Sequence, residues 1–247
     1  MTEDYKKVAL IPARSGSKRI IDKNIYPLNG YPLIAYTIVL AIQSNIYDDI
    51  FVITDSEKYA EISKKFGAKV PFLRPKSISG DISPDIEWVK YSLNKLEALG
   101  NKYDIFSILR PTSPFRSIQM LKNSMEKFLH SSKIDSLRAI EKCTQHPGKM
   151  WVVSNNKQIM TPLFPLRIND TYWHSNQYSS LPEIYVQNAS LEISWTRNVI
   201  ENNSISGEII MPYETESFEG FDINNIVDIY LAETLIKNNY VKTLING

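Results

Sequence analysis

Residues 8–24, VALIPARSGSKRIIDKN, decide the fold of this chain. The segment opens with an apolar run at 8–11, which is typical of a buried strand in a parallel sheet, and Pro12 ends it because proline cannot donate to a ladder. The loop that follows combines small residues with three cations: Ala13, Arg14, Ser15, Gly16, Ser17, Lys18 and Arg19. Such a loop can turn its backbone N–H groups onto phosphate oxygens while the cations neutralise their charge. The segment therefore predicts a site for a nucleoside triphosphate, with an ordinary basic surface turn as the alternative.

Two better-known phosphate loops are excluded by the same segment. The sequence has no G-x-x-x-x-G-K-[ST], so it contains no P-loop, and no G-x-G-x-x-G follows the strand, so a dinucleotide-binding fold has no support.

Strand and helix patterns alternate outward from this segment. Short apolar runs at 50–54 and 105–109 read as further buried strands. Apolar residues recur at helical spacing in the segments 33–40, 86–96 and 118–128, and Asp55 and Ser56 can cap a further helix that runs to Phe66. This alternation predicts an α/β fold, with a mostly parallel sheet and helices on both faces. Ligands of such sheets bind at the carboxyl ends of the strands, where segments 12–19 and 110–116 follow.

The composition favours a soluble enzyme. At 247 residues and 43% hydrophobic content, the chain can form a single domain over 1–247. A formal net charge of +1 argues against nucleic acid or a membrane surface as partner. One cysteine, Cys143, cannot form an internal disulfide, and the N-terminus lacks the apolar stretch of a signal peptide, so a cytoplasmic location is expected.

The middle of the chain breaks the alternation. From about 141 to 185 it is rich in proline, amides and aromatic residues, including Trp151, Phe164, Tyr172, Trp173 and Tyr178. Aromatic residues among short β-like runs predict an excursion that packs on another surface. A long irregular loop on a monomer is the alternative, although such loops are uncommon in compact domains.

Several blocks of the sequence resemble those of one enzyme family. IPARSGSKR followed by KNI resembles the opening signature of the acylneuraminate cytidylyltransferases, the CMP-sialic acid and CMP-nonulosonic acid synthetases, with Ser15 in place of a common glycine. RPKSISGD (74–81), LRPTSPFR (109–116), the segment 185–188 and GFDIN (220–224) resemble further blocks of that family in the same order. The resemblance spans nearly the whole chain.

The resemblance implies both a fold and a reaction. The fold is the Rossmann-like nucleotide-diphospho-sugar transferase fold, with an arm at about 141–190 that makes a homodimer and brings residues into the partner's active site. The reaction transfers CMP from CTP to the anomeric hydroxyl of a nonulosonic, sialic-acid-like keto-sugar acid for glycan biosynthesis. Pyrophosphate is released, and Mg²⁺ is required.

Candidate residues follow from the matching blocks. Nucleotidyl transfer needs aligned reactants and neutralised phosphates. The catalytic cations are expected to be Arg14, Lys18 and Arg19. The resemblance places the other nucleotide contacts at Ala13, Ser15, Gly16, Ser17, Asn24, Arg74 and Asp81, although Arg74 could also be a solvated surface arginine.

Asp222 is the expected magnesium ligand. It matches the first carboxylate of the family's D-x-D run, but the second position is Asn224. The second contact is then left to Asp228 or to water, since Mg²⁺ needs only one or two carboxylates beside phosphate oxygens. On sequence alone, Asp222 could equally cap the final helix.

The acceptor side departs most from the family. Arg110 replaces a common glutamine, and a pair of arginines upstream of Tyr185 is missing. A guanidinium can bind a carboxylate through two hydrogen bonds, so Arg110 is expected to bind the carboxylate of the sugar acid. The alternative ties Arg110 to Asp104 or Glu219. The resemblance adds further sugar contacts at Thr112, Ser113, Lys149, Tyr185 and Asn188.

Three other functions remain open on the sequence. The acceptor could be another ulosonic acid or a phosphonate, or the base could differ. Asn224 also leaves open a non-catalytic sugar-nucleotide-binding module of the same fold. Zinc is not expected, because His130, His146 and His174 are isolated, with no H-x-x-x-H motif and no cysteine partner at metal spacing.

Overall fold

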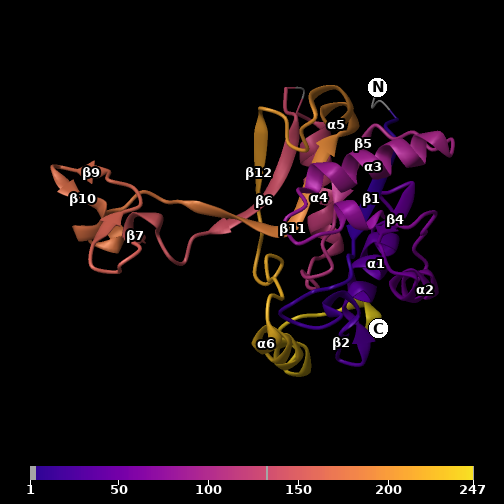
Figure 1. Ribbon diagram of the computed structural model, residues 1–247, viewed down its shortest axis with the longest axis horizontal. Helices are drawn as coiled ribbons and strands as arrows, with labels where there is room; N and C mark the ends of the chain where they lie inside the picture. Colours follow the sequence, from indigo (N-terminus) through magenta and orange to yellow (C-terminus); the bar gives the residue numbers. More distant parts are fainter. Residues whose placement is uncertain (1–3, 132, 247) are drawn as a thin grey trace. The chain divides into compact units, whose positions relative to one another are not determined.

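The computed structural model describes residues 4–131 and 133–246, which form two compact units. The sheet unit contains Met1–Ala139 and Asn188–Gly247, and the insert unit contains Ile140–Gln187. Figure 1 colours the chain by sequence, so the insert unit appears in pink to orange. Each unit is described by itself below.

A six-stranded sheet with the strand order β12-β6-β11-β5-β1-β4 organises the sheet unit (Figure 1). Its strands are β1 (Lys7–Pro12), β4 (Asp49–Ile53), β5 (Ile105–Ile108), β6 (Ser136–Lys142), β11 (Tyr185–Trp195) and β12 (Ile210–Glu214). β1 pairs in parallel with both β4 and β5, whereas β11 runs antiparallel to β5. The three predicted strands therefore form the parallel part of the sheet, and β11 adds a strand of opposite direction.

β1 lies at a topological switch point. The chain passes from β1 to β4 on one side and then crosses to β5 on the other side. Leu10 of β1 is paired with Phe51 of β4 and Ile108 of β5, so the three strands end at the same edge. Crevices at such points hold the ligands of open α/β sheets. The segments after β1 and β5 therefore meet where a ligand is expected.

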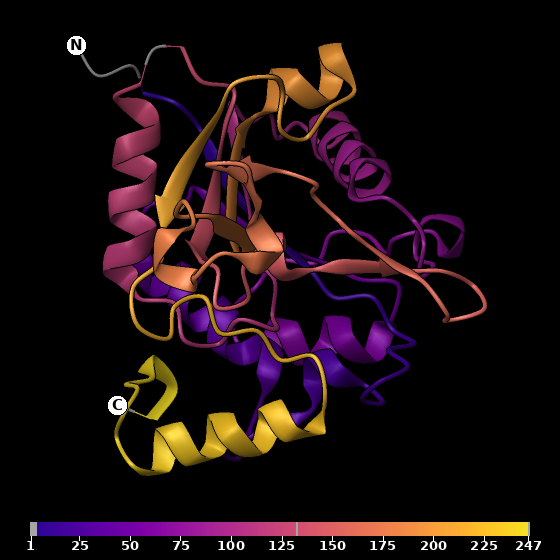
Figure 2. The ribbon, with the colours of Figure 1, turned by 90° about the vertical axis from the view of Figure 1, so that its left-hand side faces the viewer.

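Helices cover both faces of the sheet, which confirms the predicted α/β layers. They are α1 (Leu33–Ser44), α2 (Glu57–Lys65), α3 (Asp85–Ala98), α4 (Ile118–Leu129), α5 (Thr196–Asn202) and α6 (Ile226–Lys237). Ala9 and Ile11 of β1 belong to a buried cluster with residues of α1, α2 and α4. Val8 and Leu10 point to the opposite face, into a cluster with residues of α3 and α5. Successive strand residues face opposite ways, so the apolar run of β1 is buried on both sides, with α4 and α3 on opposite sides of the sheet in Figure 2.

A third buried cluster joins α6 to the start of the chain. It includes Leu28 of the short hairpin β2 (Pro27–Leu28) and β3 (Tyr31–Pro32), together with Tyr36 of α1 and Ile229 of α6. The Tyr36 hydroxyl donates to the Leu28 carbonyl at 2.7 Å, and burial raises the pKa of Tyr36 to about 12. Through this cluster the segment that precedes α6 is brought to the loop after β1.

The insert unit has secondary structure and buried contacts of its own. β7 (Trp151–Val153) pairs with β8 (Met160–Pro162), and β9 (Arg167–Ile168) pairs with β10 (Thr171–Tyr172), both antiparallel. His146 is buried, accepts from the Gly148 N–H at 2.9 Å through Nδ1, and packs against the rings of Trp173 and Tyr178. The predicted excursion is therefore structured and is not an irregular loop, while its role in dimerisation stays a prediction.

Within residues 4–131 and 133–246, no helix has the length and apolar character needed to cross a membrane.

Candidate active site

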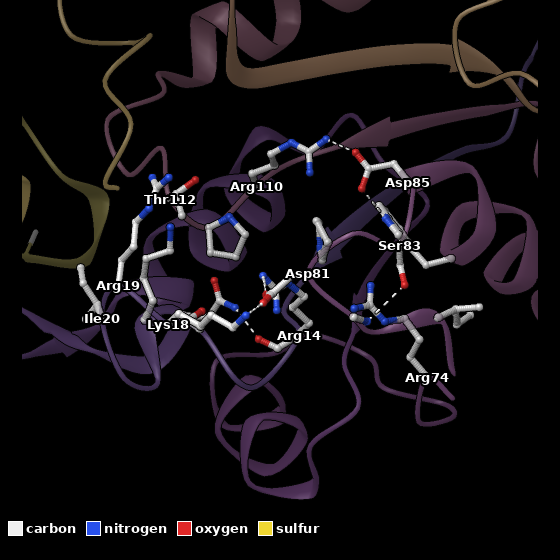
Figure 3. Close-up of a pocket in the computed structure, with 18 residues that line it drawn as sticks. Arg14, Lys18, Arg19, Ile20, Arg74, Asp81, Ser83, Asp85, Arg110 and Thr112 are labelled. Atoms are coloured by element: carbon white, nitrogen blue, oxygen red, sulfur yellow. Dashed lines mark hydrogen bonds and ion pairs between the residues drawn. The ribbon is translucent and has the colours of Figure 1, made fainter. Parts of the chain in front are cut away.

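A cavity of about 500 Å³ opens at the switch point, between the segments that follow β1, β4 and β5 (Figure 3). Six cationic side chains line it: Arg14, Lys18, Arg19, Lys23, Arg74 and Arg110. Two carboxylates, Asp81 and Asp85, also line it. This excess of positive charge suits a polyanionic ligand such as a nucleoside triphosphate.

The basic loop after β1 already holds an anionic group. Ala13 is buried, and its N–H continues the β1–β4 pairing by donating to the Ile53 carbonyl at 2.9 Å. Arg14 and Lys18 both bind the Asp81 carboxylate, at 2.7 and 2.5 Å, as Figure 3 shows. Hydrogen bonds from Lys18 and Arg14 hold the pKa of Asp81 below its usual range. The cations are thus arranged to grip oxyanions between them.

Ser15 is placed differently from the expectation that it contacts the nucleotide. Its backbone N–H donates to Asp55 Oδ1 and its hydroxyl donates to Asp55 Oδ2, each at 2.7 Å. Both donors are therefore occupied by a carboxylate of the neighbouring strand end. Gly16 follows with φ 76°, a left-handed conformation suited to glycine, and Ser17 lines the cavity.

Lys23 is a cavity cation that was not among the predicted site residues. Its ammonium donates to the Ile223 carbonyl at 3.0 Å, and burial lowers its pKa against the opposing field of Asp222. Its neighbour Asn24 is buried and donates to the Arg14 carbonyl at 3.1 Å. The available signal was its position in the KN pair of the opening block, directly before a residue that was selected.

Arg74 is buried in the cavity wall, so it is not a solvated surface arginine. Its N–H extends β4 by donating to the Thr54 carbonyl at 2.7 Å, and its Nε donates to the Ser79 hydroxyl at 2.9 Å. Burial lowers the pKa of Arg74, and the nearby carboxylates of Asp55 and Asp85 act against that shift. The remaining guanidinium face lies on the cavity (Figure 3).

Arg110 belongs to a chain of ion pairs at the far wall. Its Nη2 lies 2.5 Å from Asp85 Oδ2 and 2.8 Å from Glu192 Oε1, and Arg138 binds the other oxygen of Glu192. Burial works to raise the pKa of Asp85, but Arg110, Trp88 and Arg138 together outweigh burial, so the pKa is lowered. Trp88, which was also missed, donates to Asp85 Oδ1 at 2.7 Å.

The two carboxylates considered as alternative partners of Arg110 have other partners. Asp104 accepts from the Lys6 N–H at 2.9 Å, and Glu219 accepts from the Ser117 hydroxyl at 2.5 Å. The alternative was right that Arg110 is held by carboxylates and wrong about which ones.

Arg116 fixes the turn that presents Arg110. It is buried, and it donates to the main-chain carbonyls of Arg110 and Ser190 and, at 3.1 Å, to the Thr37 hydroxyl. Burial lowers the pKa of this guanidinium. The Arg116 guanidinium thus holds the segment 110–116 in place through these hydrogen bonds.

Asp222 is joined to the cavity wall through the main chain. The Ile223 N–H donates to the Thr112 carbonyl at 2.8 Å, and Asp222 Oδ2 accepts from the Asn224 amide at 2.7 Å. Its other oxygen, Oδ1, is buried and has no hydrogen-bond partner among the described residues. Ser113 is likewise buried, and its hydroxyl lacks a partner in the described part of the chain.

The helix-cap alternative for Asp222 is wrong. Asn225 caps α6 by accepting from the N–H groups of Val227 and Asp228, and Asp228 completes a capping box. Asp228 Oδ2 accepts from the N–H groups of Asn224 and Asn225, at 2.7 and 2.9 Å. Asp228 is therefore engaged at the helix start. Across the described residues, three or more acidic, histidine or cysteine side chains nowhere gather as a metal cluster.

The remaining predicted sugar contacts lie in both units. Asn188 is buried in the sheet unit, where its amide donates to the Thr215 hydroxyl at 2.9 Å. Lys149 belongs to the insert unit, and its ammonium donates to the carbonyls of His174 and Asn176, at 2.9 and 2.6 Å. Tyr185 also belongs to that unit, with its hydroxyl 3.5 Å from Glu183. Lys149 thus stabilises the fold of the insert unit in one chain.

Comparisons with known proteins identify the family of this chain. A cytidylyltransferase family model matches residues 8–202. The chain is 32% identical to CMP-N,N'-diacetyllegionaminic acid synthase of Legionella pneumophila, covering 94% of this chain and 97% of that enzyme. It is 30% identical to N-acylneuraminate cytidylyltransferase of Escherichia coli over 93% of this chain and 52% of that enzyme, so it spans about half of that relative.

A solved structure shares the fold. CMP:2-keto-3-deoxy-manno-octonic acid synthetase complexed with CTP superposes with a TM-score of 0.69 at 16% identity, covering 95% of this chain and 99% of that chain. The basic cavity at the switch point and the family match over most of the sheet unit lead to one conclusion. This chain belongs to the cytidylyltransferase family.

Proposed function

We propose that this protein transfers CMP from CTP to the anomeric hydroxyl of a nonulosonic, sialic-acid-like sugar acid. The hydroxyl oxygen bonds to the α-phosphorus of CTP, the bond to the β-phosphate oxygen breaks, and pyrophosphate and a proton are released. The observation that carries the proposal is the cavity in which Arg14, Lys18, Arg19 and Lys23 converge beside the loop of the matched family block. The named relatives, which include legionaminic and neuraminic acid enzymes, support the acceptor class.

The triphosphate is proposed to replace Asp81 at the basic loop. Carboxylate and phosphate oxygens accept the same charge-assisted hydrogen bonds, so Arg14 and Lys18 can exchange one for the other. Asp81 is then released toward the ribose, as expected from its sequence block. Asn24 and Arg74, buried at the same wall, are the proposed contacts to the cytosine and ribose.

Asp222 fits the requirements of a magnesium ligand. Its buried Oδ1 has no partner among the described residues, and one carboxylate with phosphate oxygens and waters suffices for Mg²⁺. Asp222 would hold the ion, and Mg²⁺ would supply positive charge that offsets the charge of the phosphates. Lys23, held at the adjacent Ile223 carbonyl, supports the same region of negative charge.

Arg110 is the proposed contact to the sugar carboxylate. Asp85 and Glu192 fix its guanidinium through Nη2, and both ion pairs are only partly exposed, so the side chain is oriented before the acceptor arrives. Thr112 and Ser113 follow on the same turn and offer hydroxyl groups. Lys149, Tyr185 and Asn188 complete the proposed acceptor contacts.

The insert unit is proposed to make a homodimer in the cytoplasm. It exposes apolar side chains on its strands, including Val152, Val153 and Met160. Such side chains favour burial against a second protein surface. A second copy of the chain, through its own insert unit, is the proposed partner.

A pyrophosphate-release assay tests the function. CTP, UTP, ATP and GTP are each offered with N,N'-diacetyllegionaminic, N-acetylneuraminic and pseudaminic acids, and with a keto-deoxyoctonic acid as the smaller acceptor. We expect release with CTP, Mg²⁺ and at least one nonulosonic acid. Release with the octonic acid alone would assign another acceptor, and CTP binding without release would indicate a non-catalytic module.

A further inference from the structure

Asp55 contacts the basic loop although it does not line the cavity. It follows β4, and its two oxygens accept from the backbone N–H and the hydroxyl of Ser15, each at 2.7 Å. Ser15 follows β1, the neighbour of β4 in the sheet, so the contact bridges two adjacent strand ends. Both hydrogen bonds end on a charged acceptor, which makes them stronger than bonds between neutral groups.

A helix-capping role does not explain Asp55. The next residue, Ser56, is the N-cap of α2, and its hydroxyl accepts from the Tyr59 N–H at 3.4 Å. The carboxylate of Asp55 points instead to the loop of the other strand. Its partner therefore lies 40 residues earlier in the chain.

We propose that Asp55 is a positioning residue that holds the basic loop in the shape that receives the triphosphate. The inference rests on the proposed function. The two bonds fix Ser15 between Arg14 and Gly16, and Gly16 turns the chain toward Lys18 through its left-handed conformation. Arg14 and Lys18 then reach a single anion from opposite sides of the tether.

The loop needs such a tether because its cations repel one another. Four cations from the segment 14–23 line one cavity, and the mutual repulsion of Lys23 with Arg19 and Arg14 contributes to the lowered pKa of Lys23. Asp55 supplies a compensating negative charge, which also acts on Arg74. A preorganised loop binds its ligand without the cost of ordering it first.

Ser15 makes this tether stronger than a glycine would. Any residue except proline can supply the N–H bond, whereas only a hydroxyl side chain adds the second bond to Oδ2. The second bond therefore depends on the hydroxyl of Ser15. Removing the hydroxyl should therefore weaken the tether without abolishing it.

The test compares Asp55→Ala, Asp55→Asn and Ser15→Ala with the wild-type chain. Hydrogen exchange of the loop 13–18 is measured without ligand, and CTP and CMP binding and the kinetic constants are measured with Mg²⁺. We expect Asp55→Ala to accelerate loop exchange and to raise the KM for CTP at least about tenfold, with the acceptor KM unchanged. CMP binding should change less, because CMP lacks the two outer phosphates. Asp55→Asn and Ser15→Ala should fall between Asp55→Ala and the wild type.

Asp49→Ala is the matched control. Asp49 begins the same strand, β4, and binds Lys69 and Tyr103 at the end remote from the loop. It should lower the melting temperature while leaving loop exchange and the KM for CTP unchanged.

The outcomes separate the tether from the proposed function. Unchanged loop exchange in Asp55→Ala, or an equal rise of the CTP KM in Asp49→Ala, would overturn the positioning role. A wild-type protein that binds CTP without turning over any acceptor would refute the proposed transfer. The comparisons of loop exchange and CTP binding would still test whether Asp55 positions the loop.

Discussion

Arg14 and Lys18 hold Asp81, and this contact sets the residue-scale requirement for nucleotide binding. The incoming triphosphate must compete with one carboxylate for two cations. It brings more negative charge than Asp81 does, so the exchange favours the nucleotide. Arg19 and Lys23 add positive charge to the cavity. Neither forms an ion pair with Asp81 in the described structure.

Lys18→Ala and Arg19→Ala should each lower kcat/KM for CTP by about 10²-fold, because each removes a cation that stabilises developing phosphate charge. Steady-state pyrophosphate release measures the change. Lys58→Ala serves as the control, since Lys58 binds Asp22 outside the cavity and should leave turnover unaltered. Turnover near the wild-type rate in both loop variants would contradict the phosphate-loop assignment.

Arg110→Gln should raise the KM for the sugar acid at least about tenfold, or about 1.4 kcal/mol, while the KM for CTP stays constant. The reason is the loss of a guanidinium that can face a carboxylate at the cavity wall. The two KM values are measured by varying each substrate in turn.

Arg138→Gln separates recognition from ion-pair disruption. Arg138 binds the same Glu192 without lining the cavity, so it disturbs the ion pairs and not the proposed sugar contact. An equal loss in both variants would show that the effect of Arg110 arises from Glu192 and not from the acceptor.

At the scale of elements, neighbouring polar residues at the start of α6 have different hydrogen-bond partners. Asn225 and Asp228 satisfy the helix N-terminus, while Asp222 lies before it with one buried oxygen that has no partner in the described part of the chain. The capping box therefore leaves the Asp222 carboxylate available to a cation.

Asp222→Asn should abolish magnesium-dependent turnover while leaving the melting temperature nearly unchanged. Asn225→Ala should do the reverse, lowering stability by about 1 kcal/mol through loss of the cap and retaining the magnesium dependence. Magnesium titrations of activity and thermal unfolding of both variants measure the two effects. A collapse of stability in Asp222→Asn, with activity following the folded fraction, would make Asp222 structural.

Asp135 gives the β6–β12 edge a pH dependence. It accepts from the backbone N–H groups of Glu208 and Ile209, at 2.8 and 2.9 Å, and hydrogen bonds from Ile209 and Glu208 lower its pKa below 3.8. A lowered folded-state pKa means that its stabilisation is complete above the unfolded value and is lost as pH falls through the folded one.

Asp135→Asn should therefore lower the melting temperature at neutral pH, with the difference from the wild type shrinking as the pH falls below about 3.9, the ordinary pKa of an aspartate. Thermal unfolding across this range measures it. Glu61→Gln, an exposed change on α2, is the comparison and should give a small difference. A gap between wild type and Asp135→Asn that is constant with pH would show that the carboxylate charge is not what stabilises this edge.

For the whole molecule, the cavity and the proposed dimer surface lie in different units. The cavity and its cations belong to the sheet unit, whereas the insert unit has its own strands and its own buried histidine. Val152 and Ile159 of the insert unit are 52% and 66% exposed. A dimer through this unit would remove such apolar surface from water.

The double change Val152→Glu and Ile159→Glu should convert a dimer to a monomer at micromolar concentration, because it places charge in the proposed interface. Sedimentation velocity measures the state. Leu99→Glu, at the end of α3 and also exposed, should leave the dimer intact. A fully active wild-type monomer would refute both the dimer and a site shared between subunits.

Local patterns in the sequence were sufficient for the parallel core and for the basic loop. The apolar runs at β1, β4 and β5 are buried on both faces of the sheet. Because such strands are apolar at every position, a short continuous apolar run predicts them. Ser56 could also be predicted as a helix cap, because its partner, the Tyr59 N–H, is only three residues away in the sequence. The chemistry of the loop followed from its cations and small residues.

The partners of the polar side chains depended on tertiary structure. Ser15 finds Asp55 because β1 and β4 are neighbours, and Arg110 finds Glu192, 82 residues away, because β11 pairs antiparallel with β5. A sequence pattern carries the period and chemistry of its own segment, but a hydrogen bond needs two groups within about 3 Å. The order of the strands decides which distant groups come that close, so residue type determined the kind of site and the tertiary fold determined which residues share it.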